Sequence, residues 1–131
     1  MSVLSQLISL FSPGGSEPPG TRRVEPQEAA RLVREKQAVL VDVREPPEWA
    51  GGVAAKAALL PLSDLSGPRR QWKPFLAEVG GREILLYCRS GSRSGLAARI
   101  LAAEGFRAAN AGTLRAWVQA GLPVCQPKAA R

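Results

Sequence analysis

Short apolar runs alternate with stretches of helical periodicity along most of the chain. Residues 38–41 and 84–87 form unbroken apolar runs that are too short for helices. Such runs are typical of strands that are buried on both faces of a parallel sheet. Elsewhere, apolar residues recur at every third or fourth position. This spacing predicts helices that begin at Pro26 and at Trp72, a helix over residues 94–104, and a last helix that Thr113 caps and that runs to residue 120.

The remaining segments complete an alternating order of strands and helices. We expect short strands near Val24 and over residues 57–60 and 107–110, and a loop over residues 63–70. Because strands and helices alternate, the sequence predicts an α/β fold with a central parallel sheet and helices on both faces. For Trp72 we prefer a core position to a place at the mouth of a substrate site.

The two ends of the chain differ in composition from its middle. Residues 1–12 place apolar side chains on one helical face, and residues 13–20 are rich in proline and glycine, as linkers are. We therefore expect an amphipathic segment and a linker over residues 1–20, a folded domain over residues 21–124, and a tail over residues 125–131. The apolar face of residues 1–12 is too short and interrupted to span a membrane. We prefer a short helix packed on the domain or a loose tail, and contact with a partner or a membrane surface stays an alternative.

A polar loop with one cysteine joins the strand at residues 84–87 to the next helix. Cys88 stands at the end of the strand, and it is followed by Arg89, Ser90, Gly91, Ser92, Arg93 and Ser94. Small residues allow such a loop to curl until its N–H groups converge on one point, where the helix N-terminus adds its positive end. With Arg89 and Arg93 nearby, this arrangement predicts a lowered pKa for Cys88 and a binding site for an anion.

The position of Cys88 decides between two interpretations. A lone cysteine is most often part of the core. A core cysteine is expected inside a strand, whereas Cys88 lies between Tyr87 and a polar loop, so we interpret it as a nucleophile. The other cysteine, Cys125, lies in the predicted tail. We interpret Cys125 as a bystander, and a role in resolving an oxidised Cys88 is the alternative.

Composition excludes several kinds of chemistry. The sequence contains no histidine, which excludes serine–histidine and cysteine–histidine catalysis and histidine-ligated metals, so we expect no metal and no cofactor. Its two cysteines form no disulfide framework and suit a reducing, cytoplasmic setting. The formal net charge of +7 comes from scattered arginines without a nucleic-acid-binding motif. We interpret this charge as a basic surface that attracts anions, and we expect no nucleic acid partner.

Several motifs along the chain occur together in one known family. They are Leu40-Val41-Asp42-Val43-Arg44-Glu45 with Glu48-Trp49, the run from Tyr87 to Ser94, Gly105-Phe106, and Ala116-Trp117 with Gly121-Leu122-Pro123. On these motifs, residues 22–124 resemble a single-domain rhodanese, the thiosulfate sulfurtransferase fold. The resemblance implies a three-layer domain and places Asp42 and Arg44 near the cysteine loop, where we interpret them as ion-paired supports. The chain departs from the usual pattern at residues 52–57 and 112–113, and neither departure touches the loop.

The resemblance also implies a reaction. Cys88 would take the outer sulfur of a small anionic donor such as thiosulfate, hold it as a persulfide, and pass it to cyanide, a thiol or a protein acceptor. One alternative is a module that carries or binds a persulfide for a protein partner, and another is a cysteine phosphatase or arsenate reductase. Phosphatase loops place an arginine after a cysteine and five further residues, whereas here the arginine comes one place earlier, at Arg93. The shorter loop favours sulfur over phosphate.

Overall fold

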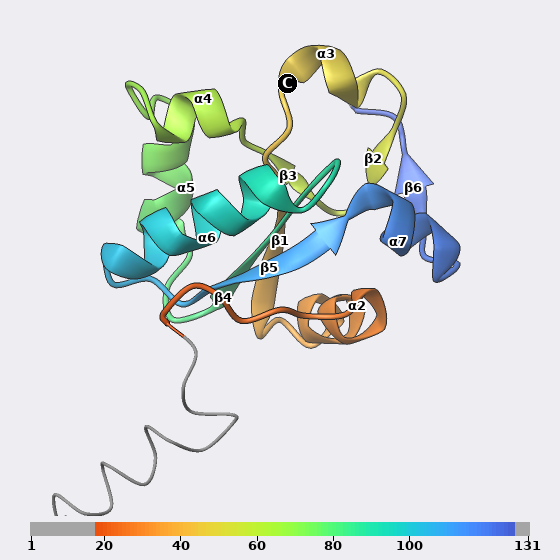
Figure 1. The fold of residues 1–131 in the computed structure, drawn as a ribbon, viewed down its shortest axis with the longest axis horizontal. Coiled ribbons are helices and arrows are strands. Elements are labelled where there is room, and N and C mark those ends of the chain that lie inside the picture. Colours follow the sequence, from red (N-terminus) through yellow and green to blue (C-terminus); the bar gives the residue numbers. More distant parts are fainter. Residues whose placement is uncertain (1–17, 128–131) are drawn as a thin grey trace, which may run out of the picture.

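A four-stranded parallel sheet forms the centre of the domain, with the spatial order β3-β1-β4-β5 (Figure 1). These strands are β1 (Ala38–Asp42), β3 (Ala58–Leu59), β4 (Glu83–Cys88) and β5 (Ala108–Thr113). The computed structural model describes residues 18–127, so the predicted amphipathic segment at residues 1–12 lies outside the described residues. The register pairs Asp42 with Tyr87 and Cys88 with Thr113. The carboxyl ends of β1, β4 and β5 therefore meet at one edge of the sheet.

Helices cover both faces of this sheet, which confirms the predicted three-layer α/β fold. The helices α2 (Pro26–Arg34) and α7 (Leu114–Gln119) pack on one face, and α4 (Leu62–Leu65), α5 (Trp72–Glu78) and α6 (Ser92–Ala103) pack on the other (Figure 1). The side chains of β4 alternate between these two layers. Leu86 and Cys88 join the core under α4, α5 and α6, whereas Leu85 and Tyr87 join the core under α2 and α7. Burial on both faces explains why the run at residues 84–87 is apolar throughout.

Shorter elements complete the domain around the sheet. The helix α3 (Pro46–Trp49) follows β1, and β2 (Val53–Ala54) pairs with β6 (Val124–Cys125) in an antiparallel ladder. Thr113 caps α7 as predicted, because its Oγ1 accepts a hydrogen bond from the N–H of Ala116 at 2.9 Å. Trp72 is confirmed as a core residue: it is 0% exposed, and its Nε1 donates to the backbone oxygen of Pro61 at 3.0 Å.

The loop predicted over residues 63–70 is wrong in part, because α4 occupies its beginning. Asp64 lies in this short helix, and its carboxylate accepts hydrogen bonds from the backbone N–H groups of Arg70, Gln71 and Trp72. Unpaired N–H groups at the start of a helix need such an acceptor. The carboxylate of Asp64 therefore satisfies the N–H groups at the start of α5 and ties α5 to α4.

Folded structure reaches beyond the predicted domain at both ends. Gly20, which we assigned to the linker, has a φ of +84° and lies so close to α6 that an added Cβ would meet the backbone oxygen of Ala98 at 2.7 Å. Cys125, which we assigned to the tail, is paired in β6. Within residues 18–127, no helix has the length and apolar character needed to cross a bilayer. The domain as described thus includes Gly20 and Cys125.

Candidate active site

Cys88 is the last residue of β4, and its sulfur lies under the loop that follows. The N–H of Gly91 donates a hydrogen bond to Cys88 Sγ at 3.0 Å, and Ser94 donates from its N–H and from its hydroxyl, each at 3.4 Å. Gly91 has a φ of +89°, a conformation that side-chain-bearing residues rarely adopt. This turn brings the loop N–H groups around the sulfur, as the small residues predict.

Burial and hydrogen bonding act on this thiol in opposite directions. Burial raises the pKa of Cys88, because a thiolate in the interior loses its water. The hydroxyl of Ser94 and the backbone N–H groups of Ser94, Gly91 and Ser90 lower the pKa of Cys88, and together they outweigh burial, so that it lies below its ordinary value of 9.0. The direction agrees with the sequence prediction. The hydrogen bonds of the loop account for it.

The helix α6 begins at Ser92, earlier than the predicted start at Ser94. Ser92, Arg93 and Ser94 therefore all belong to its first turn. Ser92 and Ser90 are exposed, and the N–H of Ser92 donates to Ser90 Oγ at 3.4 Å. Of the serines in the loop, only Ser94 directs its hydroxyl to the sulfur in the described structure.

Asn110, which the sequence did not single out, ties the cysteine loop to β5. Its Oδ1 accepts hydrogen bonds from the hydroxyl of Ser94 at 2.8 Å and from the N–H of Gly112 at 2.9 Å, and its Nδ2 donates to the backbone oxygen of Gly91 at 2.9 Å. Asparagine is uncommon within strands, so a polar residue in a run of alanines at residues 108–111 was the available signal. Asn110 thus links β5 to Gly91 and Ser94, the two loop residues that donate hydrogen bonds to Cys88 Sγ.

Arg93 forms a double contact with Glu48 of α3. Its Nη1 and Nη2 lie 2.7 and 2.9 Å from the two carboxylate oxygens. The N–H of Glu45 also donates to Glu48, at 3.0 Å. The hydrogen bond from Arg93 is the largest cause that holds the pKa of Glu48 down, to about 2. The charge that we expected Arg93 to offer to an anion is therefore compensated in this structure.

Asp42 and Arg44 form the predicted ion pair at the carboxyl end of β1. Arg44 Nη2 lies 2.9 Å from Asp42 Oδ2. Arg44 Nη1 donates to the backbone oxygen of Glu48 at 3.2 Å, and Nη2 also donates to the backbone oxygen of Gly52 at 2.8 Å. The hydroxyl of Tyr87 donates to Asp42 at 2.6 Å. The ion pair holds the segment that carries Glu48, and the side chain of Glu48 in turn contacts Arg93 of the cysteine loop.

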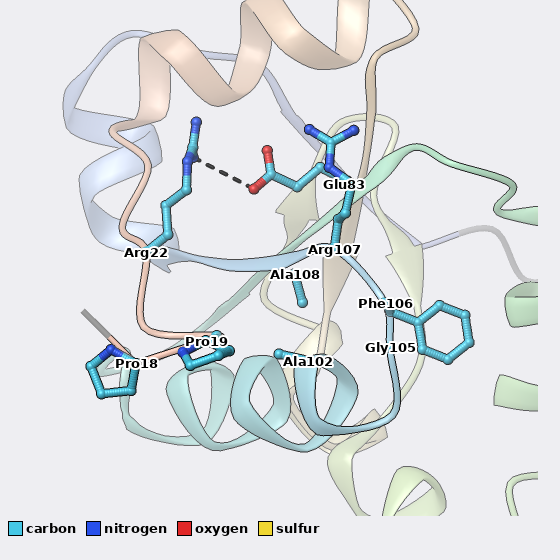
Figure 2. A pocket seen from close by; sticks show the side chains of 10 residues that line it. Pro18, Pro19, Arg22, Glu83, Ala102, Gly105, Phe106, Arg107 and Ala108 are labelled. Atoms are coloured by element: carbon cyan, nitrogen blue, oxygen red, sulfur yellow. Dashed lines mark ion pairs between the residues drawn. The ribbon is translucent and has the colours of Figure 1, made fainter. Parts of the chain in front are cut away.

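Two cavities lie at opposite edges of the sheet. Arg89 is exposed and lines one of about 590 Å³ beside the cysteine loop. The other has a volume of about 610 Å³. Its lining includes Arg22 and Glu83, whose side chains point toward one another in Figure 2. Arg22 Nη1 lies 3.6 Å from Glu83 Oε2. Glu83 is the first residue of β4 and Cys88 is the last. Ligands of open α/β sheets bind at the carboxyl edge, so the candidate site lies at Cys88.

Comparisons with known proteins identify the family of the chain. Residues 25–120 match the family model of the rhodanese-like domain. A sulfurtransferase of Allochromatium vinosum is 36% identical over 101 residues, which cover 75% of this chain and 88% of that protein. An uncharacterised protein of Synechocystis is 37% identical over 107 residues, which cover 80% of this chain. The chain spans only 56% of the length of this second relative.

Solved structures lead to the same family. The crystal structure of a rhodanese-related protein from Thermoplasma volcanium is 25% identical, has a TM-score of 0.67, and is matched over 81% of this chain and 99% of that one. The similarity to a sulfurtransferase supports sulfur transfer as the general chemistry. Because the family model matches most of the chain and includes the strand, loop and helix around Cys88, the chain belongs to the rhodanese-like domain family.

Proposed function

We propose that this protein is a sulfurtransferase that moves a sulfane sulfur from a small anionic donor, such as thiosulfate, to a thiophilic acceptor through a persulfide on Cys88. The observation that carries the proposal is the convergence of N–H and hydroxyl donors from Gly91 and Ser94 on the cysteine sulfur. Hydrogen-bond donors arranged in this way stabilise a thiolate, and the thiolate is the nucleophilic form of cysteine.

In the first half of the reaction, the thiolate of Cys88 attacks the outer sulfur of thiosulfate. A bond forms between Sγ and that sulfur, the sulfur–sulfur bond of thiosulfate breaks, and sulfite leaves with the bonding electron pair. The persulfide that remains on Cys88 carries one negative charge. The loop N–H groups stabilise this charge as the donors of an oxyanion hole do, because they are already oriented before the reaction.

In the second half, an acceptor such as cyanide attacks the outer sulfur of the persulfide. The bond between that sulfur and Sγ breaks, its electron pair stays on Sγ, and the thiolate of Cys88 is restored. Donor and acceptor thus react in separate steps on the same sulfur, which is double-displacement chemistry with a covalent intermediate.

The roles of the charged residues follow from their contacts. Arg93 is held by Glu48, so we propose that it shapes the first turn of α6 and contributes little free charge to anion binding. Arg89 is exposed, and we propose that it attracts the anionic donor. Asp42 and Arg44 support the segment of Glu48. No step of the proposed reaction needs a metal or a cofactor.

Steady-state kinetics with thiosulfate and cyanide test this function. A persulfide intermediate predicts parallel lines in double-reciprocal plots at several cyanide concentrations. Hydrolysis of an aryl phosphate should be negligible, because the loop is one residue shorter than a cysteine phosphatase loop and Arg93 is paired. Efficient aryl phosphate hydrolysis without thiocyanate production would contradict the proposal. Discharge to a protein thiol that is much faster than discharge to cyanide would favour a persulfide carrier.

A further inference from the structure

An open cavity adjoins the cysteine loop at the carboxyl edge of the sheet. Its volume is about 590 Å³, and it is lined by Arg44, Arg89, Leu114, Arg115, Val118 and Gln119. Thr113 is the register partner of Cys88, and Leu114 follows it directly. The cavity therefore begins beside the strand end that carries the thiol, unlike the cavity in Figure 2, which lies at the other end of β4.

Arg89 and Arg115 contribute two positive charges to the lining of this cavity. Both residues are exposed. Within residues 18–127, neither side chain has an ion-pair partner, and no acidic residue lines the cavity. Arg44, by contrast, is paired with Asp42. A ligand carboxylate in this cavity would therefore meet two exposed guanidinium groups, one of them on the residue that follows Cys88.

The lining of the cavity also includes two apolar side chains of α7. Val118 is 51% exposed, and Leu114, which is half-buried, lies one helical turn before it on α7. Side chains at this spacing lie on one face of a helix. A volume of about 590 Å³ suits a small organic ligand and exceeds what thiosulfate or cyanide fills. The ligand that complements the cavity has a short aliphatic part and carboxylates.

We propose that this cavity binds the sulfur acceptor, and that the acceptor is a small aliphatic thiol that bears carboxylates. The inference rests on the proposed function, because it needs a persulfide on Cys88. Arg89 and Arg115 hold the carboxylates, Val118 and Leu114 contact the methylene groups, and the thiol reaches toward the outer sulfur.

The transfer is balanced in atoms and charge. The thiol gives its proton to water, and its sulfur attacks the outer sulfur of the persulfide. A new sulfur–sulfur bond forms on the acceptor, and the bond to Cys88 Sγ breaks with its electron pair left on Sγ. One persulfide anion and one thiol become one acceptor persulfide anion, the Cys88 thiolate and one released proton. No external oxidant or reductant takes part.

Discharge kinetics of the loaded protein test the acceptor site. The Cys125→Ser protein is incubated with thiosulfate, freed of excess reagent, and checked by intact mass for one added sulfur. It is then mixed with mercaptosuccinate, which has two carboxylates, or with 2-mercaptoethanol, which has none. In Arg115→Ala the ratio of the two discharge rates should fall about fivefold, the size expected when one exposed ion pair is lost. In Arg115→Glu the ratio should fall further.

The matched control is Arg99→Ala, which removes an exposed arginine from α6 instead of α7 and should leave the ratio unchanged. Raised salt should lower the ratio in the unmodified protein, because exposed charges are screened. An unchanged ratio in both Arg115 variants overturns the acceptor site while sulfur transfer itself stands. Failure to gain the sulfur before any thiol is added contradicts the proposed function instead, and the acceptor site falls with it.

Discussion

Replacement of Ser94 by alanine should make the thiol of Cys88 less acidic while the fold stays in place. The hydroxyl of Ser94 lies 3.4 Å from Cys88 Sγ and 2.8 Å from Asn110 Oδ1. It has one proton, so it donates to one of these acceptors at a time. When the proton turns to the sulfur, Asn110 Oδ1 keeps the N–H of Gly112. A thiolate can therefore use the hydroxyl without leaving a buried acceptor unpaired.

The size of the effect follows from the strength of this hydrogen bond. A hydrogen bond to a charged group contributes about 1.5–3 kcal/mol. Because the hydroxyl must turn away from Asn110, we expect the lower end, about 1.5 kcal/mol. About 1.4 kcal/mol corresponds to a tenfold change in an equilibrium, so the thiolate fraction below the pKa of Cys88 should fall about tenfold. The N–H donors of Gly91 and Ser94 persist in the variant, because they belong to the main chain.

The pH dependence of alkylation by iodoacetamide measures this change. In a Cys125→Ser background only Cys88 reacts, and the rate rises with pH through its pKa because the thiolate is the reactive form. The midpoint in Ser94→Ala should move to higher pH. Ser92→Ala, which removes an exposed hydroxyl without a bond to the sulfur, is the matched control and should not move it. Identical profiles for both variants would mean that main-chain N–H groups alone determine the pKa of Cys88.

Other contacts give further predictions. The pKa of Glu48 is lowered from 4.5 to about 2, so its pair with Arg93 stabilises the fold above pH 4.5, and this contribution disappears as the pH falls toward 2. Urea unfolding of Glu48→Gln should show a loss of about 1 kcal/mol at neutral pH and none near pH 2; a loss that does not depend on pH would contradict the pairing. Tyr87→Phe removes the donor to the buried carboxylate of Asp42 and should cost about 1–3 kcal/mol in free energy of unfolding, also measured with urea. Deletion of residues 1–17 should leave turnover of thiosulfate with cyanide unchanged, because the contacts described around the sulfur come from later residues.

The central strands β1 and β4 could be predicted from the sequence, because each of them is covered on its two faces by helices. An unbroken apolar run has few other interpretations. Since Cys88 directly follows such a run, its place at the carboxyl edge of the sheet could be predicted too. The residues around the sulfur were harder to predict. Glu48 and Arg93 are 45 positions apart, and their contact depends on how α3 sits over the first turn of α6. Asn110 reaches the loop from a neighbouring strand, which no local pattern reveals.

The source of the lowered pKa of Cys88 could be predicted only in part. Arginines next to a cysteine are visible in a sequence, and we expected them to contribute. Backbone N–H groups are present at every residue except proline, so a sequence does not tell which of them will point at a sulfur. The small residues of the loop indicated that it curls, and the φ of +89° at Gly91 shows where the turn occurs. The pairing of Arg93 with Glu48 then removes much of the charge that the sequence suggested.

The central claim is that the sulfur in transfer is carried by Cys88, and intact-mass analysis tests it most directly. After incubation with thiosulfate and removal of the excess, the Cys125→Ser protein should gain the mass of one sulfur atom and lose it when cyanide is added. The Cys88→Ser protein, in which serine keeps nearly the same shape but stays protonated, should gain nothing. Added sulfur on the Cys88→Ser protein, or none on the Cys125→Ser protein, would contradict the account.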